Sequence, residues 1–273
     1  MEIFTEELSE PLFKKLAVLF KKNSGINLKD YKKYLVEYRL QKFVGEGKPF
    51  KDFLSYYKAL EADKTGKLRT EFVNSLTTNY TYFFREEVHF RFLEHYLNRH
   101  ASTEPYLRFW SAGCSSGEEA YSMAITCLEH GAAQRDIKIL ATDISMKVLT
   151  FAAEGVYHYS KIKGNLSDST LRKYFIFQAD KKDFEVKEEV KRLVTFRYLN
   201  LMDPFPFHKR FDMVFLRNVL IYFDSQEKEI ILEKIWEEIK NGGYLILGLS
   251  ESLVGIRHRF TQLKYSIYRK DSP

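Results

Sequence analysis

The sequence is poor in cysteine and proline, and it contains no long apolar run. Only two of its 273 residues are cysteine, Cys114 and Cys127, and their spacing is not that of a metal-binding knuckle. A disulfide framework and a metal site are therefore not expected, and both thiols are interpreted as small packing residues. No stretch approaches the roughly 18 apolar residues of a membrane span, and the acidic residues 1–7 lack the features of a signal peptide. These absences predict a cytoplasmic location.

The sequence is rich in charged residues, with a moderate excess of basic over acidic ones. The net charge is +6, and a composition that is 45% hydrophobic and 29% charged fits one small and one larger folded domain. The basic excess is concentrated between Leu12 and Lys42. This stretch contains nine Lys and Arg residues but only two acidic residues. This pattern predicts either a solvated helix face or a docking surface for an acidic helix or for phosphates.

The first 76 residues carry the periodicity of short helices. Leu12, Leu16 and Leu19 recur at helical spacing, and a second such run begins at Leu35 after a break at residues 23–27. We expect a small all-helical N-terminal domain over residues 1–76.

The remaining residues, 77–273, alternate between strand-like and helix-like stretches. This alternation predicts an α/β domain with a mainly parallel sheet covered on both faces by helices. Two glycines at residues 242–243 are expected to end the last long helix before the final parallel strand. Residues 260–269 read as β-structure without a helical crossover, which predicts an antiparallel edge strand or hairpin.

An insertion interrupts this alternation at about residues 160–193. It contains two strand-like runs, residues 175–177 and 184–186, joined by a polar turn. The pattern predicts an inserted β-subdomain, which is either decoration or an exposed sheet edge that can receive a peptide.

The most informative stretch is residues 107–121, which reads as a buried strand, a tight loop of small residues and the start of a helix. Such a loop can approach a nucleotide-like cofactor closely. Glu118 and Glu119 open the helix, where they would repel a pyrophosphate, and the G-x-G-x-x-G fingerprint is missing. The loop therefore favours a cofactor with a cationic part. S-adenosylmethionine, with a sulfonium, an ammonium and a ribose, fits this requirement.

Two further strand ends are expected on the same side of the sheet, because ligands of open parallel sheets bind beyond the carboxyl ends of the strands. One ends in Asp143, whose carboxylate can accept both hydroxyls of a ribose. An acidic residue at this place also occurs in nicotinamide enzymes, so Asp143 alone does not decide between cofactors. The other end leads into RNVLIY at residues 217–222.

Taken together, these motifs resemble the chemotaxis receptor methyltransferases, the CheR family. The matching stretches follow the family's order and cover nearly the whole chain: TNYTYFFRE at 78–86, WSAGCSSGEE at 110–119, ATDI at 141–144, GVY at 155–157, Asn200–Leu201 and LRNVLIYFD at 216–224. The resemblance implies a Rossmann-like S-adenosylmethionine-dependent methyltransferase sheet with an antiparallel C-terminal edge, a helical N-terminal substrate-docking domain and an inserted β-subdomain.

The resemblance also implies an activity. The family transfers a methyl group from S-adenosylmethionine to glutamate side chains on the cytoplasmic helices of chemoreceptors, the methyl-accepting chemotaxis proteins. The products are glutamate methyl esters, which serve sensory adaptation, and S-adenosylhomocysteine. A receptor C-terminal tether that binds the β-subdomain is a further expectation, whereas nucleic acid and membrane insertion are not expected.

Site residues carry over where the motifs match. The resemblance assigns cofactor binding to Asn79, Thr81, Arg85, Ala112, Glu118, Asp143, Asn200, Leu201, Leu216 and Arg217. It places Tyr222 near the transferred methyl group, and we expect Arg85 and Tyr222 to take part in catalysis. The resemblance also places Arg39 and Lys42 where the second helix of the family faces its substrate, so we expect the basic residues Lys32, Lys33, Arg39 and Lys42 to take part in substrate docking.

Some features depart from the family or suggest other readings. The family commonly has proline where Ala120 stands, and often histidine where Leu249 stands. The stretch DPFPF at residues 203–207 superficially resembles a motif of amino methyltransferases, but it follows the third strand and is interpreted as a decoy. A methyltransferase acting on nucleic acid and an inactive cofactor-binding scaffold are the alternatives.

Overall fold

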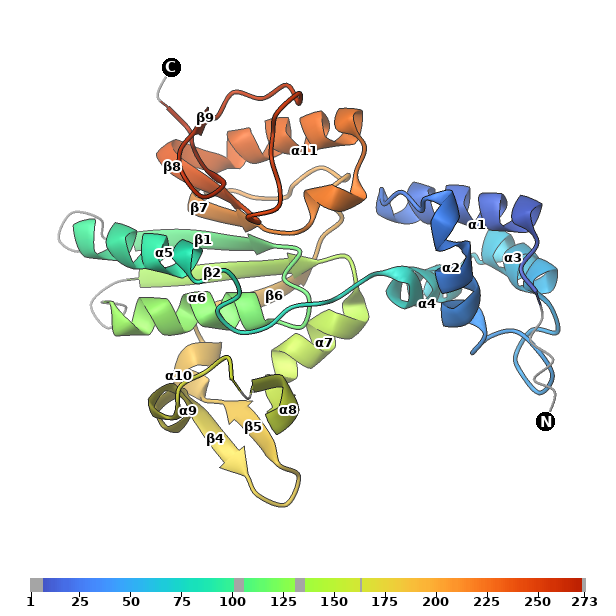
Figure 1. Ribbon diagram of the computed structural model, residues 1–273, viewed down its shortest axis with the longest axis horizontal. Coiled ribbons are helices and arrows are strands. Elements are labelled where there is room, and N and C mark those ends of the chain that lie inside the picture. The colour runs from blue at the N-terminus through green and yellow to red at the C-terminus, as the bar shows by residue number, and fades with distance from the viewer. Residues whose placement is uncertain (1–6, 101–105, 131–135, 163, 272–273) are drawn as a thin grey trace. The chain divides into compact units, whose positions relative to one another are not determined.

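The computed structural model describes residues 7–100, 106–130, 136–162 and 164–271. The chain forms two compact units (Figure 1). The first comprises residues up to Thr78 together with Tyr222–Asp224, and the second comprises Asn79–Ile221 and Ser225–Pro273.

The first unit is built from short helices that share one apolar core. On the first helix Phe13, Leu16 and Phe20 recur at helical spacing, and all three are fully buried. A left-handed Gly25 ends this helix, and its N–H donates to the Lys21 carbonyl at 2.7 Å. The elements are α1 (Glu10–Ser24), η1 (Asp30–Lys32), α2 (Lys33–Leu40), α3 (Phe53–Ala62) and α4 (Lys67–Leu76). The predicted all-helical character of this part is confirmed.

The second unit is organised around a seven-stranded sheet with the order β6-β2-β1-β7-β8-β10-β9. The first five of these strands run parallel, and β9 and β10 add an antiparallel edge. The central strand β7 is buried at all six positions, and β1 is buried over its last four residues, which fits strands covered on both faces. The strands are β1 (Tyr106–Ala112), β2 (Asp136–Asp143), β6 (Val194–Tyr198), β7 (Phe211–Leu216), β8 (Ile239–Leu247), β9 (Thr261–Gln262) and β10 (Ile267–Arg269). This topology confirms the predicted fold class.

Helices alternate with these strands along the chain (Figure 1). They are α5 (Val88–Arg99), α6 (Glu118–Glu129), α7 (Met146–Glu154) and α11 (Ser225–Glu238), with a 3-10 turn η3 (Leu220–Tyr222) before α11. Among the described residues, no helix combines the length and the apolar composition that crossing a bilayer requires.

The expectation that the glycines at 242–243 end a helix is wrong. The helix α11 stops at Glu238, and both glycines lie inside β8, where the register against β7 shifts between Phe211 and Met213. Gly242 has a φ of 79°, and a Cβ at Gly243 would lie 2.8 Å from the Asp212 carbonyl oxygen. The glycines therefore allow a bulge in a strand, a role that the same dipeptide serves as readily as a helix end.

The insertion forms a small antiparallel sheet of its own, with strand order β3-β5-β4. The predicted hairpin is present as β4 (Phe175–Gln178) and β5 (Asp183–Val186). Its third strand, β3 (Val156–His158), lies before the predicted insertion and was not anticipated. Three short helices complete the subdomain: α8 (Tyr159–Ile162), α9 (Asp168–Tyr174) and α10 (Glu188–Lys191).

Candidate functional site

The loop after β1 turns sharply at two glycines. Gly113 has a φ of 80°, and a Cβ there would lie 2.5 Å from Val219 Cγ2. Gly117 has a φ of 96°, and a Cβ there would lie 2.8 Å from the Ala152 Cβ. Both positions need glycine, because a side chain would meet these neighbours and because L-residues rarely adopt such angles. Ala112, the predicted site residue at the end of β1, is buried directly before this loop.

Asp143, at the end of β2, holds the same loop through its carboxylate. Its Oδ2 accepts the backbone N–H of Ser115 at 2.9 Å, and its Oδ1 accepts the N–H of Ser145 at 2.8 Å. Burial raises the pKa of Asp143, and these backbone donors oppose the rise by stabilising the charged form. A carboxylate has about four lone-pair sites, so two hydrogen bonds leave capacity for ribose hydroxyls.

Glu118 starts α6 as a second buried carboxylate beside the loop. Only 1% of its surface is exposed, and the Ser116 hydroxyl donates to its Oε2 at 2.6 Å. Burial raises the pKa of Glu118, and the Ser116 bond partly offsets that rise. The Tyr157 hydroxyl fixes the loop further by donating to the Ser116 carbonyl at 2.7 Å. Two acidic side chains at one loop favour a cationic ligand and oppose a phosphate.

The segment of residues 79–86 begins the second unit and is tied to α6. The Phe84 N–H donates to the Ser122 hydroxyl at 2.9 Å, and Phe84 has a left-handed φ of 55°. The predicted cofactor residues Asn79 and Thr81 are half-buried on this segment.

The two residues predicted for catalysis belong to different units. Arg85, in the second unit, donates to the Tyr80 carbonyl at 3.0 Å, and its guanidinium lies over the rings of Tyr80 and Tyr82. Tyr222 belongs to the first unit, where the Lys32 ammonium lies 5.8 Å from the centre of its ring.

Arg217, predicted to bind the cofactor, lies in a buried ion cluster. Its guanidinium donates to Glu119 Oε2 at 2.9 Å, to Glu86 Oε2 at 3.0 Å and to the Arg85 carbonyl. The Ser111 hydroxyl donates to the other oxygen of Glu119 at 2.6 Å. Burial alone would raise the pKa of Glu86, but the Arg217 guanidinium, together with the Leu249 N–H and the nearby His89, outweighs burial, so the pKa of Glu86 is lowered. The cluster joins the segment before α5, the start of α6 and the end of β7.

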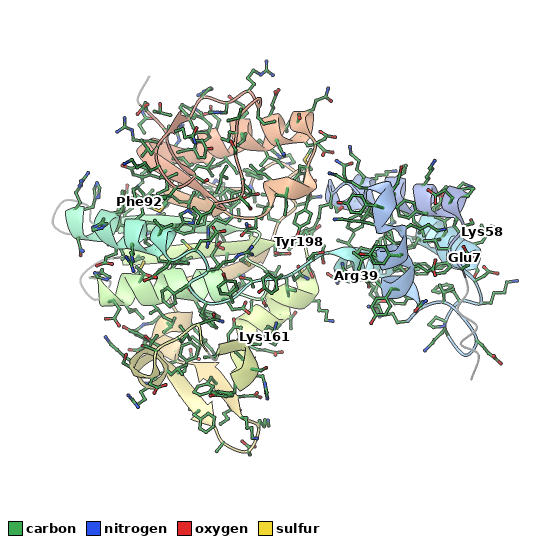
Figure 2. All side chains as sticks on the ribbon, viewed as in Figure 1. Glu7, Arg39, Lys58, Phe92, Lys161 and Tyr198 are labelled. Carbon is green, nitrogen blue, oxygen red and sulfur yellow. The ribbon has the colours of Figure 1, made fainter. Side chains whose placement is uncertain are left out.

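The ends of β2 and β6 meet beside the predicted adenine-side residues. The Leu199 N–H donates to the Asp143 carbonyl at 3.1 Å, and the next two residues, Asn200 and Leu201, are buried. The Lys234 ammonium, from α11, donates to the Leu201 carbonyl and so fixes this loop. Tyr198 precedes the loop at the end of β6 (Figure 2).

Leu216 and the DPFPF stretch are packing elements in the second unit. Leu216, a predicted cofactor contact, is fully buried at the end of β7. Phe205 and Phe207 pack edge-on against Trp110, with ring centres 5.2 and 4.9 Å from it. Phe205 and Phe207 therefore pack against a buried aromatic residue of β1.

The four predicted docking residues differ in their partners. Arg39, on α2 (Figure 2), donates to the carbonyls of Leu76 and Thr77 at 2.7 and 3.0 Å, where α4 ends. The Lys33 ammonium lies 4.0 Å from the Glu10 carboxylate at the start of α1. The Lys32 ammonium lies over the Tyr222 ring. Lys42 is exposed. Arg39 thus uses its donors within the unit.

Sequence reasoning missed Glu86, Glu119 and Lys234 as residues that position the site. A signal existed for the first two, since each directly follows a predicted site residue in a matched motif. Nothing near Lys234 in the sequence pointed to a loop 33 residues away. Cys114 makes no disulfide, and burial raises the pKa of its thiol well above the usual value, so it is a neutral packing residue.

Buried His89 is expected to make the stability of this region depend on pH. The imidazole is fully buried on α5, with its Nε2 2.8 Å from the Tyr265 carbonyl, and burial followed by the nearby Arg217 lowers its pKa to about 4. The unfolded chain binds a proton near pH 6.5, so stability is expected to fall as the pH drops from 6.5 to 4, by roughly 3 kcal/mol in total. Urea unfolding at pH 7.5 and 5.0 measures the loss.

The His89→Asn variant should lose less stability between these two pH values than the wild type. The matched control is His95→Asn, which changes an exposed histidine on the same helix and should leave the wild-type pH dependence unaltered. Equal pH dependence in the wild type and His89→Asn would contradict the prediction.

Comparisons with known proteins cover nearly all of the chain. A family model described as "CheR methyltransferase, SAM binding domain" matches residues 79–269, and one described as "CheR methyltransferase, all-alpha domain" matches residues 11–77. A chemotaxis protein methyltransferase of Borreliella burgdorferi is 43% identical over 247 residues, which cover 85% of each chain. One from Vibrio parahaemolyticus is 36% identical over 264 residues, which cover 94% of each.

Among solved structures, the N-methyltransferase NodS from Bradyrhizobium japonicum is similar in fold. The alignment covers 70% of this chain and 71% of the NodS chain. Its TM-score is 0.35 and its sequence identity is 14%. A likeness at this level adds no argument about this chain.

Proposed function

Because this chain belongs to the CheR methyltransferase family, we propose that it transfers the methyl group of S-adenosylmethionine to glutamate side chains on the cytoplasmic helices of chemoreceptors. The observation that carries the proposal is the pair of buried carboxylates, Asp143 and Glu118, at a glycine loop that excludes side chains. Their negative charge suits a sulfonium and an ammonium and opposes a pyrophosphate.

The residues at the loop fit this cofactor by their chemistry. Asp143 retains lone pairs for the ribose hydroxyls, and Glu118 offers negative charge for the methionine end. Asn200 and Leu201 would lie at the adenine side, as the family resemblance suggests. When bound, S-adenosylmethionine supplies an electrophilic methyl group on a positively charged sulfur.

The proposed chemistry needs placement more than proton transfer. A glutamate carboxylate has a reference pKa near 4.3, so at neutral pH it is already a nucleophile and needs no general base. Its oxygen would form a bond to the methyl carbon that bound S-adenosylmethionine supplies, and the sulfur would keep the electrons of the broken carbon–sulfur bond. The residues of the site must align the oxygen with this bond and exclude water.

Arg85 and Tyr222 are proposed to act in this step. Arg85 carries a cation that can orient an incoming carboxylate, and Tyr222 can shape the methyl pocket. We expect Arg85→Ala and Tyr222→Phe to reduce turnover more than cofactor binding. Calorimetry that showed cofactor affinity falling in proportion to turnover would remove both residues from the chemical step.

The reaction is tested by its product. Receptor cytoplasmic fragments are incubated with the protein and methyl-labelled S-adenosylmethionine, and then treated with mild alkali. Glutamate methyl esters release labelled methanol, and this is the expected result. Label that survives alkali would indicate N-methylation, and absence of label would indicate an inactive cofactor-binding protein; either outcome rejects the proposal.

The β-subdomain is proposed to bind a receptor C-terminal tether. Ile176 and Phe177 on β4 expose 52% and 54% of their surface, and β4 is an edge strand of its sheet. An edge strand can pair with an extended peptide. If deleting the tether of a candidate receptor leaves its methylation rate unchanged, the β-subdomain does not serve this purpose.

A further inference from the structure

The Arg85 side chain lies against two tyrosine rings of its own segment. Its guanidinium carbon is 5.6 Å from the centre of the Tyr80 ring and 5.9 Å from the centre of the Tyr82 ring. The two rings also contact each other edge-on, with their centres 6.0 Å apart. The guanidinium donates a hydrogen bond back to the Tyr80 carbonyl at 3.0 Å. We call Tyr80 and Tyr82 the tyrosine pair.

The phenylalanines that follow the tyrosine pair are the residues that anchor this segment to the core. Phe83 is buried and packs edge-on against Tyr157, with ring centres 5.0 Å apart. Phe84 packs edge-on against Phe90, with ring centres 5.2 Å apart. Tyr80, by contrast, exposes 72% of its surface, so its ring adds little to the core. Packing in the core therefore does not account for the place of the tyrosine pair beside a guanidinium.

We propose that the tyrosine pair positions the Arg85 guanidinium to receive the carboxylate of the acceptor glutamate. This inference rests on the proposed function and adds two positioning residues that act through Arg85. Aromatic rings attract a guanidinium by cation–π interaction and by stacking. An arginine side chain has many rotamers, so restraining it before the substrate arrives lowers the entropic cost of binding.

The arrangement leaves donors of Arg85 for a carboxylate. A guanidinium has several N–H donors, and the described residues engage one of them through the Tyr80 carbonyl. Stacking on a ring leaves the N–H edge of a guanidinium available, and this edge can bind both oxygens of a carboxylate. The backbone is held separately, because the Arg85 carbonyl accepts a hydrogen bond from the buried Arg217 guanidinium. Both the main chain and the side chain of Arg85 are thus restrained within the second unit.

The test compares kcat/KM for a receptor cytoplasmic fragment at saturating S-adenosylmethionine. Replacing both tyrosines with leucine keeps apolar bulk but removes the rings, and it is expected to lower kcat/KM by about 10-fold. Replacing both with phenylalanine keeps the rings and should stay within about twofold of wild type. A leucine variant as active as the phenylalanine variant would overturn the inference, because bulk alone would then suffice.

Calorimetry with S-adenosylmethionine separates positioning of Arg85 from support of the cofactor site. The affinity of the leucine variant should stay within about twofold of wild type. If this affinity fell as much as kcat/KM, the tyrosine pair would support cofactor binding and the inference would be overturned.

A double-mutant cycle shows whether the tyrosine pair acts through Arg85. In an Arg85→Ala background, the two leucine substitutions should lower kcat/KM by less than about twofold. An equal loss with and without Arg85 would overturn the inference.

NMR gives a reading of the side chain that does not depend on activity. The side-chain Nε–H signal of Arg85 is assigned by its absence from Arg85→Ala. The rings should shift this signal in the wild type and in the phenylalanine variant, and it should move toward its random-coil position in the leucine variant. A signal that the leucine substitutions leave in place would overturn the inference.

The matched control is Tyr106→Leu, which removes another ring beside a guanidinium in the same unit. The Arg108 guanidinium carbon lies 5.4 Å from the centre of the Tyr106 ring, at the amino end of β1. Ligands of open parallel sheets bind at the carboxyl ends of the strands, so this variant should leave kcat/KM unchanged. A wild-type protein that yields no alkali-labile label would reject the proposed function and this inference with it. A wild type that forms methyl esters and a leucine variant of equal kcat/KM would reject this inference alone.

Discussion

Replacing Arg217 with methionine is expected to lower the melting temperature of the protein by roughly 10 °C. Arg217 is 5% exposed, and its guanidinium is the cation that bonds the carboxylates of both Glu86 and Glu119. Methionine fills much of the same volume but leaves both carboxylates in a poorly solvated cluster. Removing one member of a buried ion pair costs about 3–5 kcal/mol, because the remaining charge keeps its desolvation penalty.

Restoring charge balance separates this effect from lost packing. The triple variant Arg217→Met, Glu86→Gln and Glu119→Gln removes both stranded charges and should recover part of the lost melting temperature. The control is Arg91→Met, which breaks an exposed ion pair with Glu87 on α5 and should change stability by less than about 1 kcal/mol. The ion cluster would not stabilise the unit as described if Arg217→Met had the melting temperature of the wild type. The same conclusion would follow if neutralising the two glutamates recovered none of the lost melting temperature.

The sheet could be predicted from the sequence because its signals are local. Strand and helix periodicities appear within single stretches, and the glycine loop of residues 113–117 combines turn chemistry with a preceding buried strand. The bulge in β8 could not be read in the same way. The glycines at 242–243 suit a helix end and a bulge equally, and only their backbone hydrogen bonds with Lys270 in the folded sheet distinguish the two.

The ion cluster escaped prediction for a different physical reason. Arg217 meets Glu119 and Glu86 across 98 and 131 residues of sequence, and no local pattern encodes such a pairing. Arg39 shows the same limit. Because Arg39 lies in a basic stretch of sequence, it was expected to bind an external partner. In the structure its guanidinium donates hydrogen bonds to backbone carbonyls at the end of α4. Sequence patterns identify charges, whereas the fold decides whether their partners are internal.

Replacing Asp143 with asparagine is expected to weaken S-adenosylmethionine binding by about 100-fold. Hydrogen bonds to a charged group contribute about 1.5–3 kcal/mol each, and the variant turns a charged acceptor of ribose hydroxyls into a neutral amide. It also points an amide group at one of two backbone donors, Ser115 N–H or Ser145 N–H, which loosens the loop. Isothermal titration calorimetry measures the change. The control, Asp136→Asn, makes the same substitution at the exposed start of β2 and should leave the affinity unchanged.

The product provides an internal comparison. S-adenosylhomocysteine keeps the ribose and lacks the sulfonium, so Asp143→Asn should weaken both ligands to the same extent. Glu118→Gln should weaken S-adenosylmethionine more than the product, because neutralising this buried carboxylate removes an attraction that only the sulfonium feels in full. If Asp143→Asn spared the product, its carboxylate would act on the sulfonium charge and not on the ribose. If Glu118→Gln affected both ligands equally, Glu118 would support the loop and the ammonium end without discriminating substrate from product.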